Sequence, residues 1–259
     1  MSNLKIEVAA QRATLTLTRP ELRNAFNDEV IAELTQAFTE LGQRDDVRAI
    51  VLAAEGPAFC AGADLNWMRR MADYDRAQNL ADAARLAEML RVIHSCPKPV
   101  IARVQGDVYA GGMGLVACCD IAISTDSTHY CLSETRLGLM PATISPYVMR
   151  AMGPRAAQRY CLSAVRLEAA EALRIGFVHE VVTADRLDER VDAVARALVN
   201  ASPAAVRACK RLLQDVAQRE IDAELIAQTV AAIADVRASA EGREGVQAFL
   251  QKRQPSWLA

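Results

Sequence analysis

The sequence predicts an α/β fold in which helices cover the strands of a sheet, followed by a helical C-terminal region. Three observations indicate this fold. Strand and helix patterns alternate through the first two-thirds of the chain, the last third has helical apolar spacing almost throughout, and the 259 residues are 52% apolar and 24% charged. A chain of this length and composition is typical of one large globular domain with a sizeable core.

The N-terminal elements follow from apolar periodicity. Two alternating runs in LKIEVAAQRATLTL predict a hairpin. The next run, NDEVIAELTQAFTELGQRDD, has helical spacing, and Asn27 suits its N-cap because a side-chain oxygen there accepts an N–H of the first turn. VRAIVLAAEG then predicts a strand, and RAQNLADAARLAEMLRVIHSC predicts a second helix that ends before two prolines.

The later elements complete the alternation. PVIARVQGDV predicts one strand, GGMGLVACCD a buried helix, and IAISTDSTHYCLS two short strands. From PRAAQRYCLS onward the prediction is almost entirely helical, with a C′ residue at Gly176 and a short strand after it. Four amphipathic helices follow, in ADRLDERVDAVARALVNASP, AAVRACKRLLQDVAQ, REIDAELIAQTVAAIADVRAS and EGREGVQAFLQKR.

The composition argues against several classes of function. A net charge of −2 offers no electrostatic footprint for nucleic acid or an acidic membrane, and no apolar run is long enough to span a bilayer. Seven cysteines without a C-x-x-C pair indicate reduced thiols, and with three histidines they show no metal-ligand spacing. The sequence also lacks the G-x-S-x-G motif of serine hydrolases. Because the first ten residues have no signal-peptide pattern, we expect a cytoplasmic protein.

Two segments of small residues point to a site made by the backbone. AFCAGADLNW and VYAGGMGLVACCD each follow a predicted buried strand. Small residues leave backbone N–H groups accessible, so those of Ala63 and Gly111 could converge on one developing negative oxygen. Gly111 also begins a predicted helix, where free N–H groups and the macrodipole favour negative charge. The alternative is that both segments are tight turns; AGGMG lacks the G-x-G-x-x-G spacing of nucleotide sites.

Five segments occur in order over essentially the whole chain: RPELRNAF, FCAGADL, KPVIARVQGDVYAGGMGLVACCD, LSETRLGLMP and EGVQAFLQKR. Together they resemble the crotonase superfamily, the enoyl-CoA hydratase and isomerase-like enzymes. The resemblance implies an α/β, crotonase-like spiral of repeated ββα units over residues 1–198. It also implies that residues 199–259 form a helical region for oligomerisation into a homotrimer, or a homohexamer of paired trimers.

The resemblance further implies a coenzyme A thioester substrate. The N–H groups of Ala63 and Gly111 would hold the thioester carbonyl oxygen, in an oxyanion hole where one donor contributes about 2.7–4 kcal/mol. Glu134, in LSETRLG, would be the general acid/base, because an apolar pocket raises the pKa of a carboxyl group. Without the resemblance, Glu134 could equally be a surface acid at a turn.

The chain departs from the best-known hydratases at one position. Those enzymes carry a second glutamate, three residues after the glycine of the oxyanion hole, where this chain has Gly114. A single acid suits family isomerases, so Glu134 alone does not secure hydration. Tyr109 and Ser133 are local candidates to orient a water molecule, as is the substrate's own carboxylate.

The residues expected to bind the substrate also follow from the resemblance. The family's coenzyme A contacts fall on Arg23, Ala25, Ala61, Asp64, Leu65, Phe249 and Lys252, of which the last two commonly act in a neighbouring subunit. Lys252 has the alternative of a solvated cation at a helix end. Arg69 and Arg70 could bind a distal substrate carboxylate in a bidentate fork, or could simply face water. Coenzyme A is part of the substrate, so no separate cofactor and no metal is implied.

Two segments refine the expected substrate. GADLNWM and PATISPYV are most similar to methylglutaconyl-CoA hydratases of leucine degradation and to isohexenylglutaconyl-CoA hydratases of terpene breakdown. We therefore expect water addition to a 2-enoyl-CoA, with 3-methylglutaconyl-CoA as the first candidate. Double-bond isomerisation or decarboxylation by Glu134 alone is the alternative that Gly114 favours. A non-catalytic acyl-CoA-binding or RNA-binding relative is a third possibility, although no lysine stripe supports RNA binding.

Overall fold

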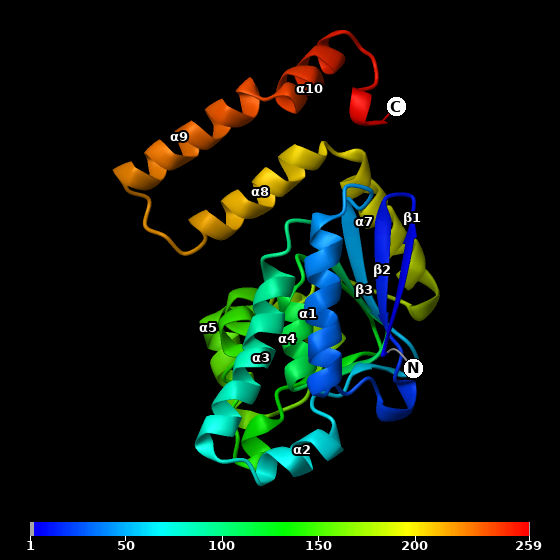
Figure 1. Cartoon of the computed structure of the whole chain (residues 1–259), viewed down its shortest axis with the longest axis vertical. Coiled ribbons are helices and arrows are strands. Elements are labelled where there is room, and N and C mark those ends of the chain that lie inside the picture. Colours follow the sequence, from blue (N-terminus) through cyan, green and yellow to red (C-terminus); the bar gives the residue numbers. More distant parts are fainter. Residues whose placement is uncertain (1–2, 259) are drawn as a thin grey trace.

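The computed structural model describes residues 3–258, which form two sheets and the helices that cover them (Figure 1). The larger sheet has six strands in the order β1-β2-β3-β5-β7-β10. They are β1 (Leu4–Ala9), β2 (Arg12–Leu17), β3 (Ala49–Ala54), β5 (Val100–Val104), β7 (Ile121–Thr125) and β10 (Glu180–Val182). β1 and β2 form the predicted antiparallel hairpin, and the remaining neighbours pair in parallel. β3 is buried along its whole length, as expected for a strand covered on both faces.

The second sheet positions the candidate site. Its strands, in the order β4-β6-β8-β9, are β4 (Ala58–Cys60), β6 (Asp107–Tyr109), β8 (His129–Cys131) and β9 (Leu167–Glu168). β4, β6 and β8 are parallel, whereas β9 is antiparallel to β8. Successive turns of the chain thus place one strand in each sheet: β3 then β4, β5 then β6, β7 then β8. A helical segment follows each pair, which confirms the predicted spiral of ββα units.

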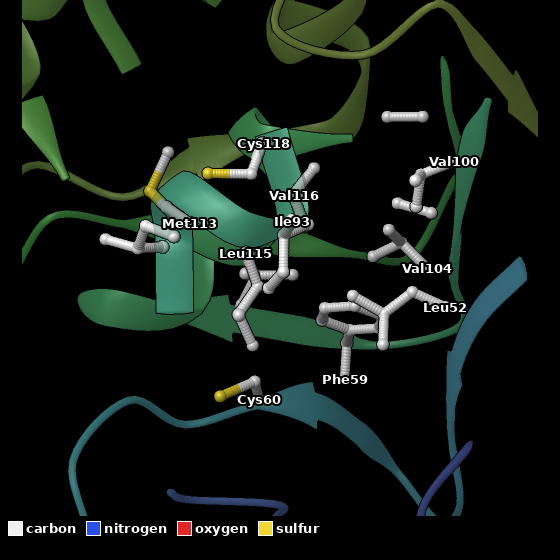
Figure 2. Packing of buried hydrophobic residues seen from close by; sticks show 14 of the residues in the cluster. Leu52, Phe59, Cys60, Ile93, Val100, Val104, Met113, Leu115, Val116 and Cys118 are labelled. Carbon is white, nitrogen blue, oxygen red and sulfur yellow. The ribbon is translucent and has the colours of Figure 1, made fainter. Parts of the chain in front are cut away.

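Ten α-helices are present among the described residues. They are α1 (Asp28–Gln43), α2 (Leu65–Ala72), α3 (Arg76–His94), α4 (Gly111–Cys118), α5 (Ser145–Ser163), α6 (Ala169–Arg174), α7 (Leu187–Asn200), α8 (Pro203–Val216), α9 (Ala223–Ala238) and α10 (Ala240–Leu250). Helices α1, α3, α4 and α5 lie on one side of the larger sheet and α7 lies on the other (Figure 1). Figure 2 shows the apolar core, where Leu52 of β3 and Ile93 of α3 pack near Leu115 of α4.

Two predicted helix ends are confirmed. Asn27 caps α1, because its side chain accepts a hydrogen bond from the N–H of Val30 at 3.0 Å. Gly176 follows the last residues of α6 with φ of +80°, the left-handed conformation that ends helices. Each of these ends depends on a local interaction, which a sequence pattern can predict.

Two other predictions are wrong. PVIARVQGDV is not one strand: it contains β5 and β6, which belong to different sheets and are separated at Gln105 and Gly106. The predicted helical run from Pro154 is interrupted by β9, which forms because Leu167 pairs with Tyr130 across the sheet. In both places a short strand is specified by its partner in the second sheet, and the local sequence carries no sign of that partner.

The last three helices form a C-terminal arm, defined as α8, α9 and α10, that extends away from the two sheets (Figure 1). Lys210 of α8 anchors the arm by donating hydrogen bonds to Asp120 at 2.7 Å and to the carbonyl of Lys98 at 3.0 Å. The arm exposes many large apolar side chains: Leu213, Ile226, Val230, Ile233, Val246, Phe249 and Leu250. The predicted boundary at residue 198 falls within the last turn of α7, so the arm itself begins shortly after that helix ends.

Candidate active site

Three candidate residues come directly after the three parallel strands of the second sheet. Ala63 lies three residues beyond the end of β4, Gly111 two residues beyond β6, and Glu134 three residues beyond β8. Because β4, β6 and β8 are neighbours, the segments that leave their carboxyl ends meet at one edge of the sheet. The topology therefore brings together residues that are about 20 to 70 positions apart in the chain.

Close backbone approach explains the small residues before Ala63. Gly62 has φ of +88°, and a Cβ there would lie 3.0 Å from the Cβ of Ala110 and 3.1 Å from the carbonyl oxygen of Tyr109. It would also lie 3.7 Å from the amide nitrogen of Gly111, so the Ala63 and Gly111 segments run side by side. Glycine is required at position 62 by both the backbone conformation and the space.

The two N–H groups at this contact are free. Neither the N–H of Ala63 nor that of Gly111 donates a hydrogen bond to any described residue, although the next amide after Ala63, that of Asp64, donates to the carbonyl of Phe26. Gly111 is the first residue of α4, where the helix leaves N–H groups without internal partners. Ala110 precedes it with φ of +48°, a strained conformation for a residue with a side chain. This residue turns the chain into the helix, and both Ala110 and Gly111 line the cavity described below.

Glu134 begins the 3-10 helix Glu134–Leu137 and is half-buried. Burial raises the pKa of its carboxyl group above the usual range, because the charged form loses hydration. Its Oε2 atom is fully buried and has no hydrogen-bond partner among the described residues. An unpaired buried carboxylate oxygen is costly in a folded protein and is typical of a group that binds or reacts.

Ala63, Gly111 and Glu134 line one cavity of about 750 Å³. Most of its wall is apolar, and the loop after the 3-10 helix contributes much of it. The lining residues are Phe26, Ala63, Trp67, Met71, Asn79, Asp82, Ala83, Leu86, Ala110, Gly111, Glu134, Gly138, Leu139, Met140, Pro141, Ala142, Thr143 and Ile144. The size suits an acyl group, and the convergence of two free donors with one buried acid suits polarisation of a carbonyl beside a proton transfer.

The place of the second acid in related hydratases is filled here by an aliphatic side chain. A Cβ on Gly114 would lie 2.3 Å from Cγ2 of Ile144 and 2.9 Å from its Cβ. Ile144 is itself buried and lines the cavity. The cavity wall at this point is therefore apolar, and neither Tyr109 nor Ser133 is among the lining residues.

Asp82 is buried and lines the cavity, but it is not among the site residues predicted from the sequence. A signal was present: Asp82 stands in the same helical stripe as Leu86, Met89 and Ile93, where an apolar residue is expected. A charged residue in such a stripe indicates a buried polar contact. Helical spacing could have indicated one partner, Arg85, but not the other, Trp67, because that residue lies on α2.

The expected coenzyme A contacts near the N-terminus have varied surroundings. Ala25 is buried and Ala61 half-buried, and the N–H of Ala61 donates to the carbonyl of Arg23 at 3.0 Å. The side chains of Arg23 and Leu65 are exposed. The carboxylate of Asp64 is already occupied: Oδ1 caps α2, and Oδ2 accepts a hydrogen bond from Arg19 at 2.8 Å.

The other predicted ligands do not reach the cavity within one chain. Phe249 and Lys252 lie at the end of α10 in the C-terminal arm, and both are exposed. Arg69 and Arg70 are exposed on α2, whereas Trp67 and Met71 form the face of that helix that lines the cavity. Arg70 is paired with Asp28, and Arg69 donates to Asn66.

No group of three or more His, Cys, Asp or Glu side chains within residues 3–258 is arranged to hold a metal ion. None of the helices in that range is long and apolar enough to cross a membrane.

Comparisons with known proteins identify the family of the chain. The model of the enoyl-CoA hydratase/isomerase family matches residues 7–259. An enoyl-CoA hydratase from Shewanella pealeana has a crystal structure with 41% identity and a TM-score of 0.96, covering 99% of this chain and 96% of that one. A candidate enoyl-CoA hydratase/isomerase (crotonase) from Legionella pneumophila is 42% identical with a TM-score of 0.94, covering 99% of both chains. The enoyl-CoA hydratase ACTT6 of Alternaria alternata is 33% identical over 94% of this chain and 80% of its own length. The chain belongs to the enoyl-CoA hydratase/isomerase family.

Proposed function

We propose that the protein is a hydratase that adds water across the double bond of a 2-enoyl-CoA thioester. The observation that carries the proposal is the cavity in which Glu134, with its unpaired buried Oε2, meets the free N–H groups of Ala63 and Gly111. Polarising a thioester carbonyl and moving one proton are the two tasks that this reaction requires.

The three groups divide the reaction between them. The N–H groups of Ala63 and Gly111 donate hydrogen bonds to the thioester oxygen, which becomes negative as an enolate forms. Ionised Glu134 accepts a proton from water as the water oxygen bonds to C3, and the same carboxyl group then delivers that proton to C2. One H and one OH are added and Glu134 returns to its starting state, so the balance needs no second acid.

Recognition of coenzyme A is proposed from family position. Arg23, Ala25, Ala61, Asp64 and Leu65 would contribute from the N-terminal side. Asp64 would contribute through its backbone, because its carboxylate is engaged within the chain. Phe249 and Lys252 would act in a neighbouring subunit of a homotrimer or homohexamer, for which the exposed apolar residues of the C-terminal arm are suited. No cofactor, nucleic acid or membrane partner is proposed, and the proposed compartment is the cytoplasm.

For the acyl group we propose 3-methylglutaconyl-CoA, an intermediate of leucine degradation, with isohexenylglutaconyl-CoA as a related alternative. The similarity of GADLNWM and PATISPYV to such hydratases supports this choice. Because the cavity lining contains no lysine or arginine, the distal carboxylate would meet the amide of Asn79, the hydroxyl of Thr143 or a group of a neighbouring subunit. Comparison with 3-methylcrotonyl-CoA, which has the same branch but no carboxylate, tests whether that end is recognised.

The deciding experiment is to incubate the purified protein with 3-methylglutaconyl-CoA and to follow the product by mass spectrometry. A gain of one water that is lost in Glu134→Gln supports the hydratase. No reaction with either this thioester or simpler 2-enoyl-CoA thioesters would contradict it, and a gain of water only with the latter would contradict the acyl assignment. Absence of any reaction, together with acyl-CoA or RNA binding that Glu134→Gln leaves unchanged, would instead indicate a non-catalytic acyl-CoA-binding or RNA-binding protein.

Double-bond isomerisation is the second candidate, and one observation favours it. Ile144 occupies the space beside Gly114, so the wall that holds the second acid in related hydratases is apolar. Glu134 would then move a proton between two substrate carbons without water. Unchanged mass with a displaced double bond would identify this reaction, and loss of carbon dioxide would identify a decarboxylase.

A further inference from the structure

A buried carboxylate, Asp82 of α3, has no part in the chemistry proposed above. It is 4% exposed and lines the cavity. A carboxylate in an apolar wall is costly unless charged or hydrogen-bonding partners compensate for the lost hydration. Arg85 lies one turn further along α3 and donates to Oδ1 of Asp82 at 2.7 Å. Asp82 and Arg85 thus form a charged pair beside the cavity.

The second partner of Asp82 comes from another helix. The indole N–H of Trp67 donates a long hydrogen bond to the same Oδ1, with an N–O distance of 3.4 Å. Trp67 is the one buried residue of α2, all of whose residues are described. Its ring also lies 6.0 Å from that of Phe26, between ring centroids. A negative acceptor in a poorly solvated wall strengthens even a long N–H contact, so Trp67 and Asp82 tie α2 to α3 from inside.

Two further side chains connect α2 to the body. Arg70 donates to Asp28 of α1, but the two side chains are 48% and 45% exposed, and an ion pair this accessible to water contributes little to holding a helix in place. Met71 is partly buried and packs against the core. The position of α2 over the cavity therefore depends on Trp67 and Met71, of which Trp67 is the more buried.

The position of α2 matters because the helix begins beside the oxyanion hole. Asp64 caps α2 through the N–H groups of Asn66 and Trp67, and Asp64 directly follows Ala63. The junction is also held from the other side, because Phe26 exchanges backbone hydrogen bonds with Gly62 and Asp64, and Arg19 pairs with the Asp64 carboxylate. A displacement of α2 that loosens these contacts would move the N–H of Ala63. The partner donor on Gly111 belongs to α4 and would not move with it.

We propose that Asp82 is a positioning residue for the oxyanion hole: through Trp67 it holds α2, and with it the N–H of Ala63, in line with the N–H of Gly111. This inference rests on the proposed function. A misplacement on the order of 1 Å at such a site lowers turnover by about 100-fold. Asp82 itself does not touch the reacting atoms.

The test compares four single variants, and the double variant Asp82→Ala/Trp67→Phe, with the wild type. Asp82→Ala and Trp67→Phe remove the acceptor and the donor, Asp82→Asn keeps an oxygen acceptor but no charge, and Arg70→Gln removes the exposed tie. Steady-state kcat and KM are measured on a 2-enoyl-CoA that the wild type converts. In parallel, bound 2,4-hexadienoyl-CoA is monitored by absorption, because its band moves to longer wavelength when the thioester carbonyl is polarised. The absorption measurement requires no turnover, so it remains informative if the proposed reaction is wrong.

We expect Asp82→Ala and Trp67→Phe to lower kcat by about 10- to 100-fold, with KM changed by less, and to reduce the absorption shift. Asp82→Asn should recover most of both quantities, and Arg70→Gln should match the wild type. Since Trp67 and Asp82 act as one unit, combining the two disruptive changes should add little. A normal kcat and absorption shift in Asp82→Ala would overturn the inference, as would a lowered melting temperature with unchanged kcat. If Asp82→Ala does not fold, equal activity of Trp67→Phe and the wild type would overturn it.

Discussion

Replacing Gly114 by alanine tests whether Ile144 closes the position of the second acid. The added methyl carbon would lie 2.3 Å from Cγ2 and 2.9 Å from Cβ of Ile144, which is 2% exposed. Both contacts involve the branched base of a buried side chain, so relief requires movement of the surrounding core. Such overpacking costs about 1–3 kcal/mol, and two contacts this short favour the upper end of that range.

The higher helix propensity of alanine offsets part of the free-energy cost of this overpacking. Position 114 lies inside α4, where alanine in place of glycine stabilises a helix by about 0.5–1 kcal/mol. The overpacking exceeds this gain, so we expect Gly114→Ala to lower the free energy of unfolding by about 1–2 kcal/mol. For a domain of this size the melting temperature should fall by roughly 2–8 °C.

A double-mutant cycle identifies the responsible atoms. Ile144→Leu retains the volume of the side chain but removes Cγ2, so the loss caused by Gly114→Ala should be smaller when Ile144→Leu is already present. Thermal unfolding followed by circular dichroism measures all four proteins under one condition. A Gly114→Ala variant that melts with or above the wild type, or strictly additive effects in the cycle, would refute the steric argument. By the same argument, Gly114→Glu alone should not raise hydratase activity.

Three further predictions concern the proposed site. Glu134→Gln should lower kcat by about 10²- to 10⁴-fold. Burial raises the pKa of Glu134, so its ionised form destabilises the fold at neutral pH. The Gln variant should therefore have a higher melting temperature at pH 7 than the wild type. This difference in melting temperature should vanish as the pH falls below the usual pKa range of glutamate, where Glu134 is protonated in both the folded and the unfolded state. Gly111→Ala places a methyl group 2.4 Å from Cζ of Phe26 and should reduce kcat at least about 10-fold; unchanged turnover would argue against this amide as a donor. Asp64→Ala removes the cap of α2 and leaves Arg19 without its buried partner, so denaturant titration should show a loss of about 3 kcal/mol.

The features that the sequence predicts are those that depend on neighbouring residues. The Asn27 cap, the Gly176 helix end and the hairpin are local, and the structure confirms each of them. The short strands β4, β6 and β9 were not predicted as separate elements, because two or three residues carry no periodicity and depend on pairing with distant segments.

The candidate site likewise has some residues that the sequence indicates and some contacts that it does not. Motifs of a known family indicated Ala63, Gly111 and Glu134, and the structure places all three around one cavity. The contacts of Ile144 with Gly114 and of Asp82 with α2 could not be derived from the sequence. Each joins segments whose proximity arises only when the spiral closes, and no spacing rule connects them.

The free N–H groups at the cavity belong to the main chain, and this affects how the protein tolerates genetic change. A codon substitution can alter a side chain, but every residue except proline retains the amide N–H at Ala63 and Gly111. The proposed donor at Ala63 therefore survives a change of its own side chain. Gly111 and Gly62 are different, because a Cβ would lie 2.4 Å from Cζ of Phe26 at the first and 3.0 Å from the Cβ of Ala110 at the second. Insertions and deletions have the opposite effect, because one residue gained or lost between β4 and Ala63, or between β6 and Gly111, would rotate or displace the amide. Functional variants should consequently keep Gly62, Gly111 and the lengths of these two loops, while residue 63 varies more freely.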